Sequence, residues 1–420
     1  MNSRRYSHYK NSGVNWLGTV PAHWSILPFK RLIDIQNGQD HKAVMQADGF
    51  PVFGSGGVFA YASDYLYDGE AILLGRKGTI DKPLYVTGKF WTVDTMYWSK
   101  IRPGVCGKFA YYVALSIPFD YYSTNTALPS MTKSALNSHL IAYPPLEEQT
   151  AICAFLDRET RKIDELIVEQ EKLVTLLAEK RQATIVHAVT RGLRRDAPMK
   201  DSGVAWMGKI PAHWGVCQSR RMFSVRSEPA LASDRMLTAS QKYGVLFQSD
   251  FVEMEGRRVV EVIMGVENLK HVEPNDFIIS MRSFQGGIEW CKLRGSTSFH
   301  YVMLKPIKGV HPPFFAHLLK SMTYVQALRA TTDLIRDGQE LRYSNFTQVD
   351  LPLVPLEEQK AIAEFLDREL SKFDKLSAEA ITAIELLRER RKALVSAAVT
   401  GQIDARGTVA LTSDESALAA

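Results

Sequence analysis

The stretch PLEEQTAICAFLDRET at residues 145–160 returns almost unchanged as PLEEQKAIAEFLDREL at residues 355–370. Two further pairs accompany it. SGVNWLGTVPAHW at residues 12–24 returns as SGVAWMGKIPAHW at residues 202–214, and AVTRG, which starts at residue 188, has its counterpart AVTGQ starting at residue 398. Self-similarity over such distances is typical of a tandem repeat. Each copy therefore consists of an entry motif, a variable block and a long conserved segment.

The variable blocks lie between the Trp motif and the PLEEQ motif of each copy. The Trp motifs are offset by 190 residues but the PLEEQ motifs by 210, so all of the extra length of the second copy falls in its block. The two blocks show no convincing similarity in sequence. We predict these segments: a repeat motif at 1–24, a first globular domain at 25–144, a long helix at 145–192, a second repeat motif at 193–214, a second globular domain at 215–354, a second long helix at 355–401 and a disordered tail at 402–420.

The conserved segments read as helices with a heptad pattern of apolar residues. Proline followed by two glutamates is typical of a helix start, and Gly192 and Gly401 stand where the helices would end. Each helix would run for about 45 residues, or about 68 Å. The seam that steps by four and three is predicted at Ile152, Leu156, Ile163, Leu166, Leu173, Leu177, Ile362, Leu366, Phe373, Leu376, Leu387 and Leu394.

Two equal seams in one chain favour each other as partners, although a helix packed on its own domain is the simpler alternative. Antiparallel pairing around a pseudo-two-fold axis would place the blocks at opposite ends of a rod, whereas parallel pairing would crowd them. We therefore predict an antiparallel coiled coil. The Trp motifs would seat the blocks on this rod, the second at the end of the first helix and the first, in space, at the end of the second helix.

Composition excludes several classes of protein. Hydrophobic residues make up 45% and charged residues 23% of the 420 residues, and no apolar run approaches the roughly 18 residues of a membrane span. The polar first ten residues do not resemble a signal peptide, so we expect a cytoplasmic protein without a membrane partner. The four cysteines form no C-x-x-C pair, which predicts small hydrophobic side chains rather than disulfides or a zinc site.

The charge is mildly basic and lies in the blocks. The net charge is +5 overall, with +2 on residues 25–144 and +3 on residues 215–354. This permits nucleic-acid binding, but predicts that the chain alone binds DNA weakly.

The first block reads as short strands between glycine-rich turns, with the apolar runs AILL at 71–74 and PLYV at 83–86. Neither GSGG at 54–57 nor GRKGT at 75–79 is a phosphate-binding P-loop. Arginine and lysine beside glycines can reach base edges or phosphates, although solvated charges on a hairpin turn are an equal alternative. The DNA-binding candidates here are Ser55, Gly56, Arg76, Lys77, Thr79, Asn125, Ser130 and Lys133.

The second block offers a strand, DFIIS at 276–280, that runs into a polar glycine-rich loop. Arg, Gln and Ser are residue types that read bases or hold phosphates. Its candidates are Arg282, Ser283, Gln285, Arg294, Ser298, Arg336, Gln339 and Arg342. We find no ATP-binding P-loop, no convincing S-adenosylmethionine motif, no metal-ligand spacing and no credible catalytic triad.

With PLEEQ at 145 and 355, FLDRE at 155 and 365, and the paired Trp motifs, the chain resembles the specificity (S) subunits of Type I restriction-modification systems along essentially its full length. The resemblance implies an α+β fold for the two blocks as target recognition domains, each reading half of a bipartite site in double-stranded DNA. It implies that the helices set the spacer and that the chain is neither an enzyme nor a cofactor binder. Two methyltransferase (M) subunits would bring S-adenosylmethionine, and two restriction (R) subunits ATP and Mg²⁺.

Three alternatives stay open. An S subunit of a methylation-only system would have the same sequence features, because the restriction subunits are other chains. A coiled-coil scaffold with protein-binding ends would make no sequence-specific DNA contact. An unrecognised enzyme with a site in a glycine-rich pocket would show turnover by the isolated chain.

Overall fold

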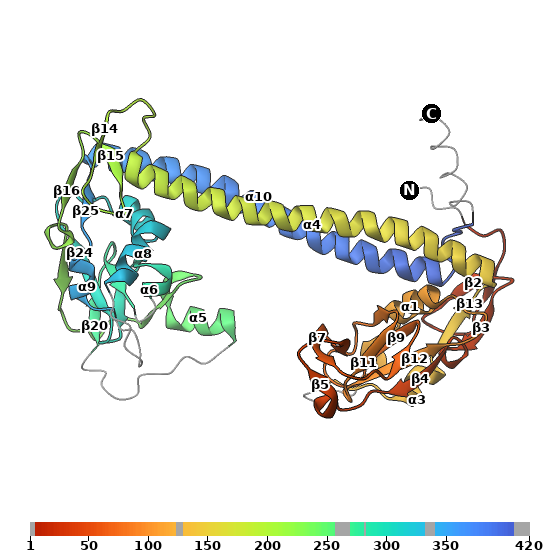
Figure 1. Ribbon diagram of the computed structural model, residues 1–420. Helices are drawn as coiled ribbons and strands as arrows, with labels where there is room; N and C mark the ends of the chain where they lie inside the picture. Colours follow the sequence, from red (N-terminus) through yellow and green to blue (C-terminus); the bar gives the residue numbers. More distant parts are fainter. Residues whose placement is uncertain (1–4, 123–128, 257–268, 281–282, 332–340, 407–420) are drawn as a thin grey trace. The chain divides into compact units, whose positions relative to one another are not determined.

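The computed structural model describes residues 5–122, 129–256, 269–280, 283–331 and 341–406 (Figure 1). The chain forms two compact units, one of residues 1–171 with 381–420 and the other of residues 172–380. Each unit holds one variable block together with part of each long helix. The unit boundaries therefore cut through the helices, which the sequence had suggested as segments of their own.

The first unit has mixed helix and strand, with a four-stranded antiparallel sheet at its centre. Its strand order is β10-β9-β12-β4, and a five-stranded sheet of order β5-β7-β6-β11-β8 lies next in the block. The strands are β1 Tyr9–Asn11, β2 Thr19–Pro21, β3 Ser25–Pro28, β4 Ile33–Asn37, β5 Met45–Gln46, β6 Phe50–Gly54, β7 Gly57–Ala62, β8 Tyr67–Asp68, β9 Ala71–Gly75, β10 Leu84–Val86, β11 Lys89–Thr92, β12 Met96–Ile101 and β13 Leu140–Tyr143. The short helices are α1 Gly107–Ser116, α2 Phe119–Tyr122 and α3 Lys133–Ser138.

The second unit repeats this plan with a four-stranded sheet of order β17-β24-β21-β22. Its strands are β14 Met199–Asp201, β15 Lys209–Pro211, β16 Gly215–Cys217, β17 Phe223–Arg226, β18 Leu237–Ser240, β19 Gly244–Phe247, β20 Lys270–Val272, β21 Phe277–Ile279, β22 Glu289–Trp290, β23 Gly295–Thr297, β24 Val302–Pro306 and β25 Leu351–Leu353. Its short helices are α5 Gln248–Glu255, α6 Ser283–Gly286, α7 Pro312–Leu318, α8 Met322–Ala330 and α9 Tyr343–Thr347.

The two units share a frame that the block sequences do not reveal. In both, the first sheet strand pairs antiparallel with the last, which pairs with a buried middle strand: β4-β12-β9 in one unit and β17-β24-β21 in the other. Both also contain a two-stranded pair in the Trp motif and another, β3 with β13 or β16 with β25, that joins the ends of the block. Thus unrelated block sequences fold onto one scaffold.

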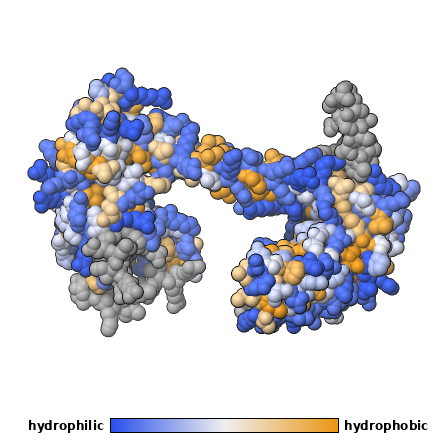
Figure 2. Space-filling view, in the orientation of Figure 1, coloured by the Kyte–Doolittle hydropathy of each residue, from blue (hydrophilic) through white to orange (hydrophobic). Residues whose placement is uncertain are grey.

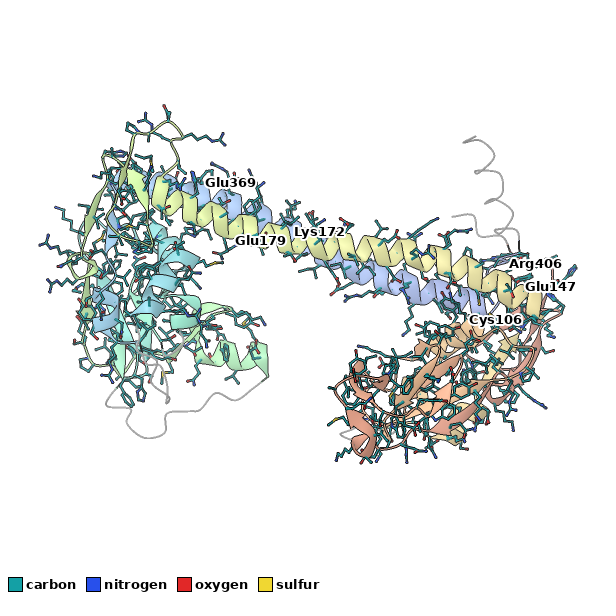
Figure 3. The ribbon with its side chains drawn as sticks, viewed as in Figure 1. Cys106, Glu147, Lys172, Glu179, Glu369 and Arg406 are labelled. Atoms are coloured by element: carbon teal, nitrogen blue, oxygen red, sulfur yellow. The ribbon has the colours of Figure 1, made fainter. Side chains whose placement is uncertain are left out.

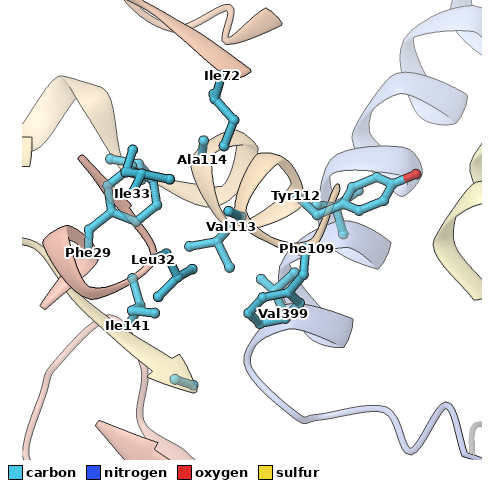
Figure 4. Close-up of a cluster of buried hydrophobic side chains, with 14 of the residues drawn as sticks. Phe29, Leu32, Ile33, Ile72, Phe109, Tyr112, Val113, Ala114, Ile141 and Val399 are labelled. Atoms are coloured by element: carbon cyan, nitrogen blue, oxygen red, sulfur yellow. The ribbon is translucent and has the colours of Figure 1, made fainter. Parts of the chain in front are cut away.

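Each core is completed by the end of a long helix. In the first unit, Phe29, Leu32, Phe109 and Val113 are buried together with Val399, the last residue of α10 (Figure 4). In the second unit the corresponding contributions come from Ile185, Ala188 and Val189 of α4. The chain therefore needs the far end of one long helix and the near end of the other to complete each core.

The long helices are α4 Leu146–Arg191 and α10 Leu356–Val399. Within the first unit Arg391 pairs with Asp164 at 2.8 Å, and within the second Arg181 pairs with Asp374 at 3.2 Å. Later residues of α4 thus meet earlier residues of α10. The pairing is antiparallel in each unit.

The buried stripe of these helices differs from the predicted seam. On α4 the buried and half-buried stripe passes through positions 152, 156, 160, 163, 167, 170, 174, 177, 181, 185 and 188, and on α10 it follows the same positions plus 210. Ten steps cover 36 residues, a period of 3.6 rather than the 3.5 of a heptad. A straight helix drifts about 20° per heptad, so a strict seam leaves the contact face.

The drift explains which seam residues were wrong. Leu166, Leu173 and Leu376 are 51%, 40% and 47% exposed. The next residue along the chain is less exposed in each case: Ile167 is buried, and Val174 and Ser377 are half-buried. The remaining predicted residues are buried or half-buried, although at the helix starts it is the globular core that covers them: Ile152 and Leu156 in the first unit, Ile362 and Leu366 in the second. Ile163, Leu177, Phe373, Leu387 and Leu394 complete the set.

A carboxylate anchors each Trp motif to the start of a long helix, and this carboxylate is buried at Glu148 and half-buried at Glu358. Glu148 accepts hydrogen bonds from the Trp24 indole at 3.0 Å and from His23 at 2.7 Å. In the second unit Glu358 receives Trp214 at 2.7 Å and His213 at 2.6 Å. Both tryptophans are fully buried. The Trp motif and the PLEEQ motif of each copy therefore meet through the same contact in both units.

The glutamine that follows each of these glutamates holds the adjoining short helix. The side-chain oxygen of Gln149 accepts the Cys106 amide at the start of α1 at 3.0 Å, and that of Gln359 accepts the His311 amide at the start of α7 at 2.8 Å. Their amide groups donate to backbone carbonyls of Pro144 and Val354. Both glutamines are fully buried. The EEQ triplet is therefore a structural connector.

The helix ends pack on the Trp motifs. Gly192 and Gly401 have positive φ angles of 70° and 76°, and a Cβ at Gly401 would collide with Pro21. The predicted disordered tail is wrong for residues 402–406, because Ala405 is fully buried in the first core and Gln402 donates to the Thr19 carbonyl at 2.6 Å. Residues 407–420 lie outside the described part. In the part of the chain that the structure describes, no helix is long and apolar enough to cross a membrane.

Replacing Glu148 with alanine should destabilise the first unit by about 1–3 kcal/mol, because the buried Trp24 N–H loses its acceptor. Glu358→Ala should act on the second unit in the same way. Urea titrations of the full chain give the free energies. The control is Glu147→Ala, an exposed neighbour, which should change stability by less than about 0.5 kcal/mol. Equal effects of the Glu147 and Glu148 variants would contradict the anchor.

Candidate nucleic-acid interface

In the first unit, four of the predicted side chains gather around the turn that follows β9. The Gly78 amide donates to the Pro129 carbonyl at 2.9 Å, and the Met131 amide donates to the Arg76 carbonyl at 3.0 Å. The backbones of Lys77 and Ser130 thereby form an isolated antiparallel β-bridge. Lys77 and Thr79 are exposed, and Arg76 is half-buried. This cluster of Arg76, Lys77, Thr79 and Ser130 presents polar and basic groups from two segments about 50 residues apart in the sequence.

The glycines of this turn are required by its backbone geometry. A Cβ at Gly75 would collide with the Thr79 carbonyl, and Gly78 has a positive φ of 84°. The guanidinium of Arg76 donates to the Asp94 carbonyl at 3.3 Å and lies 5.8 Å from the Tyr97 ring centroid. Arg76 is therefore partly held by its own unit, so Lys77 is the more available cation of the cluster.

The other candidates of the first block lie apart from this cluster. Ser55 and Gly56 form the turn of the β6–β7 hairpin. Lys133, half-buried at the start of α3, lines a shallow depression with Lys30, Ser134 and Asn137. Asn125 lies outside the described residues.

In the second unit, Gln285 on α6 is exposed and lines a groove of about 640 Å³. The groove also receives side chains from α4, α7, α8 and the turn after β18. Its basic residues are Arg181, Lys242, Lys320 and Arg329, its amides are Gln182, Gln241, Gln285 and Gln326, and none of its described lining residues is acidic. Basic groups with several amides suit phosphate contact and base readout.

Carboxylates behind the groove moderate its charge. Lys320 contacts the buried Glu289 at 2.8 Å, and Lys242 contacts Glu255 at 3.2 Å. Burial raises the pKa of Glu289, while the ammonium of Lys320 acts in the opposite direction. Oε1 of Gln182 is buried and has no hydrogen-bond partner among the described residues. The groove thus presents mainly hydrogen-bond donors, and the Gln182 Oε1 atom lies buried behind its surface.

Several candidates in the second block have structural positions. Ser283 is 1% exposed, and its hydroxyl accepts the Ser280 amide at 2.8 Å, so its prediction as a DNA contact is wrong for this conformation. A Cβ at Gly287 would collide with the Leu319 carbonyl, so this glycine permits packing of α6 rather than approach of DNA. Ser298 is half-buried and accepts the His300 amide at 3.3 Å, and Arg342 is exposed at the start of α9. Arg282, Arg336 and Gln339 lie outside the described residues.

Arg294 belongs to a charged network that fixes the edge of the second block. Its guanidinium lies 3.4 Å from Glu273, which also contacts His271 at 2.8 Å. The other ring nitrogen of His271 lies 2.7 Å from the buried Asp234. Burial lowers the pKa of His271, but hydrogen bonds with Asp234 and Glu273 outweigh it and the pKa is raised.

The groove was missed by sequence reasoning, because its residues come from separate segments between 181 and 329. Only Gln285 was predicted. Within the described residues, no group of three or more His, Cys, Asp or Glu side chains could hold a metal ion.

Both long helices expose apolar side chains. In Figure 2 these side chains are the orange areas between hydrophilic ones along the helices. In the first unit they include Leu166, Val168, Ile381 and Leu386, with exposed fractions from 48% to 60%. The second unit adds Leu173, Leu176 and Leu376. Charged residues such as Lys172, Glu179 and Glu369 stand among them (Figure 3). Apolar and charged side chains thus alternate on the exposed faces of the long helices.

These features define a protein with two copies of one mixed helix-and-strand frame, each with its own polar surface. A family model for the Type I restriction modification DNA specificity domain matches residues 29–175 and again 214–386. The chain belongs to this family and carries two copies of its domain.

Relatives agree with this assignment. The putative type I restriction enzyme MjaX specificity subunit of Methanocaldococcus jannaschii is 24% identical over 294 residues, covering 68% of this chain and 64% of the relative. The StySPI specificity subunit of Salmonella potsdam is 28% identical over 210 residues, covering 47% and 44%. The matches thus span less than two thirds of these relatives' own lengths.

Solved structures share the fold at low identity. A chain from a study of complex assembly and conformational transition of the type I R-M system has a TM-score of 0.66 at 14% identity and covers 90% of this chain and 98% of its own. The HsdS subunit from Thermoanaerobacter tengcongensis gives 0.50 at 13% identity, with 91% and 98% covered.

The raised pKa of His271 predicts a pH dependence of stability. The stabilising contribution of the charged imidazole is complete below its unfolded pKa of about 6.5 and is lost as the pH rises through the higher folded value. The unfolding free energy of the second unit should therefore fall more between pH 6 and pH 8 in the wild type than in His271→Gln. Urea titrations at several pH values test this.

His317 supplies the control, because burial lowers the pKa of His317 despite its contact with Asp367. The neutral imidazole of His317 is favoured in the folded state, so its contribution to the unfolding free energy is lost as the pH falls. His317→Gln should therefore remove a rise of the unfolding free energy with pH, the opposite of the change expected for His271→Gln. Identical pH profiles for the wild type and both variants would contradict the assignment.

Proposed function

We propose that the chain is the non-catalytic DNA-recognition subunit of a Type I restriction-modification complex, and that each unit reads one half of an asymmetric bipartite site. The observation that carries this proposal is one frame built twice with different polar surfaces. The anchors at Glu148 and Glu358 and the sheet order repeat, whereas the cluster at Arg76 and the groove at Gln285 have no common sequence. Two different reading surfaces imply two different half-sites.

We propose that α4 and α10 act as one rod that sets the spacer between the half-sites. The antiparallel ion pairs within each unit and the unbroken length of α4, 46 residues or about 69 Å, support this. The period of 3.6 favours nearly straight helices over a strongly supercoiled pair.

We propose that the exposed apolar residues of the long helices dock two methyltransferase subunits, and that two restriction subunits join the complex. The partners would supply S-adenosylmethionine, ATP and Mg²⁺ chemistry, and this chain would bind none of these. The mild charge of the blocks supports a complex in which the partner subunits contribute to DNA affinity. Net charges of +2 and +3 give this chain little affinity for DNA phosphates by itself.

The proposal is tested by mapping N6-methyladenine in the native genome with and without this gene. Loss of methylation from one asymmetric motif, two short halves around an unread gap, is expected. An unchanged map in a strain that expresses the complex would favour the scaffold alternative. Methylation without cleavage of unmodified DNA would indicate a methylation-only system.

Groove variants should separate affinity from specificity. Lys242→Gln and Arg329→Gln should each weaken DNA binding of the assembled complex on all sequences and reduce the salt slope by about one. Gln285→Ala should instead relax discrimination in one half-site by about 1–3 kcal/mol. The control is Lys308→Gln, an exposed lysine of the same unit outside the groove. Equal losses for all four variants would contradict a reading role for the groove.

Inserting seven residues at matched points of α4 and α10 should lengthen the spacer by about three base pairs, because seven residues add about 10 Å and a base pair spans about 3.4 Å. The half-sites should stay the same. Seven residues rotate the buried stripe by only about 20°, so pairing persists. Methylome sequencing of the variant gives the motif, and an unchanged spacer would contradict the rod.

A further inference from the structure

Two thiols face each other in the first unit. The Sγ atoms of Cys106 and Cys153 lie 3.5 Å apart, although the residues are 47 positions apart in the sequence. Cys106 stands at the first turn of α1, beside the early turns of α4 that carry Cys153 (Figure 3). Because the two cysteines are far apart in the sequence and lie on different helices, their spacing in the sequence did not predict a pair.

The surroundings hold the two sulfurs in place. Gln149 accepts the Cys106 amide at 3.0 Å, so the start of α1 is fixed to α4 one turn before Cys153. One turn after Cys153, Asp157 receives Lys108 of α1 at 2.6 Å and the Tyr112 hydroxyl at 2.7 Å. The thiols therefore lie between two polar contacts that join the same pair of helices.

The two thiols differ in access. Cys153 is 5% exposed and belongs to the hydrophobic core, whereas Cys106 is half-buried at its margin. A small oxidant therefore reaches Cys106 first. Cys153 is placed behind it as the second thiol.

The two thiols differ in acidity as well. The hydrogen bond with Cys153 lowers the pKa of Cys106 to about 6 against the effect of burial, and the backbone amides of Phe109 and Lys108 act in the same direction. The hydrogen bond with Cys106 and burial raise the pKa of Cys153. Because the thiolate is the reactive form, Cys106 is the nucleophile of the pair.

We propose that Cys106 and Cys153 form a reversible oxidation site that a hydroperoxide converts into a disulfide. The Cys106 thiolate attacks one peroxide oxygen, the O–O bond breaks, and with one proton the products are a sulfenic acid and, from hydrogen peroxide, water. The Cys153 sulfur then attacks the Cys106 sulfur, the S–O bond breaks, and the oxygen leaves as a second water. Two thiols are oxidised and one peroxide is reduced.

The second copy of the repeat lacks this site. The position that matches Cys153 is Ala363, which is 2% exposed, and the position that matches Cys106 at its glutamine is His311. The remaining cysteines differ too, since burial raises the pKa of both Cys217 and Cys291. The site is thus specific to the first unit, and the proposal does not rest on the DNA-recognition function.

The disulfide would tie the first block to α4 covalently. It would close a loop of about 50 residues, and such a link stabilises mainly by restricting the unfolded chain. Oxidation should therefore raise the unfolding temperature of the first unit. Reduction by a dithiol should reverse the change.

The test treats the folded full chain with hydrogen peroxide at pH 7 and follows each cysteine by mass spectrometry. A Cys106–Cys153 cross-linked peptide should form, disappear with dithiothreitol, and appear at least about ten times faster than oxidation of Cys217 or Cys291. Cys153→Ala copies the residue of the second unit, so it should fold. It should stop at the sulfenic acid of Cys106, which dimedone traps.

Two results would overturn the proposal. One is peroxide treatment that leaves both thiols free in the folded wild type while the exposed methionines oxidise. The other is a dimedone adduct on Cys106 in the wild type as abundant as in Cys153→Ala, because that would show that Cys153 does not resolve the sulfenic acid. Circular dichroism of each variant confirms that the comparison is made on folded protein.

Discussion

The structure depends on a carboxylate at the start of each long helix, buried at Glu148 and half-buried at Glu358. Glu148 and Glu358 each hold a fully buried tryptophan and a histidine of the Trp motif. A buried carboxylate is stable only when donors surround it, so the motif and the helix must come together in a fixed geometry. The glutamine that follows transmits this geometry to one short helix of each block, α1 in the first unit and α7 in the second. The EEQ triplet therefore sets the position of a whole block relative to its helix.

This constraint separates the frame of each unit from its reading surface. The frame consists of the Trp motif, the start of one long helix, the end of the other and a four-stranded sheet. The polar cluster at Lys77 lies outside these contacts, and the groove at Gln285 shares with them only the part of α4 around Ile185, while its other lining residues come from the block. Their residues can change without loss of the core, which is the property that a recognition subunit needs. Only the first unit adds a thiol pair, and it does so at the contact of α1 with α4, where the frame joins the block.

The sequence predicted the organisation well because repeated motifs report repeated contacts. The pairing of the Trp motif with the helix end followed from chain order alone. The seam was predicted with a heptad period, and its error at Leu166, Leu173 and Leu376 shows how a drift of about 20° per heptad moves a side chain into solvent. The common sheet order of the blocks was not predictable, because side-chain identity on that sheet is not shared.

The candidate site was only partly predictable, for physical reasons. The sequence predicts DNA contacts beside glycine-rich turns, but Gly75 and Gly287 are required by close contacts inside the protein. Ser283 is buried as a hydrogen-bond acceptor for its own turn. Lys242, Lys320 and Arg329 gained significance only when folding brought four separate segments to one groove. Sequence reasoning finds residue types that suit DNA, whereas the fold decides which of them share a surface.

The most direct test of two interchangeable reading units on one frame is to replace residues 25–144 with a second copy of residues 215–354 and to sequence the methylome. Because the anchors at Glu148 and Glu358 are equivalent, the account predicts a methylated inverted repeat of one native half-site with a gap close to the native spacer. Methylation of the unchanged native motif, or of a motif that keeps the replaced half, would contradict the account.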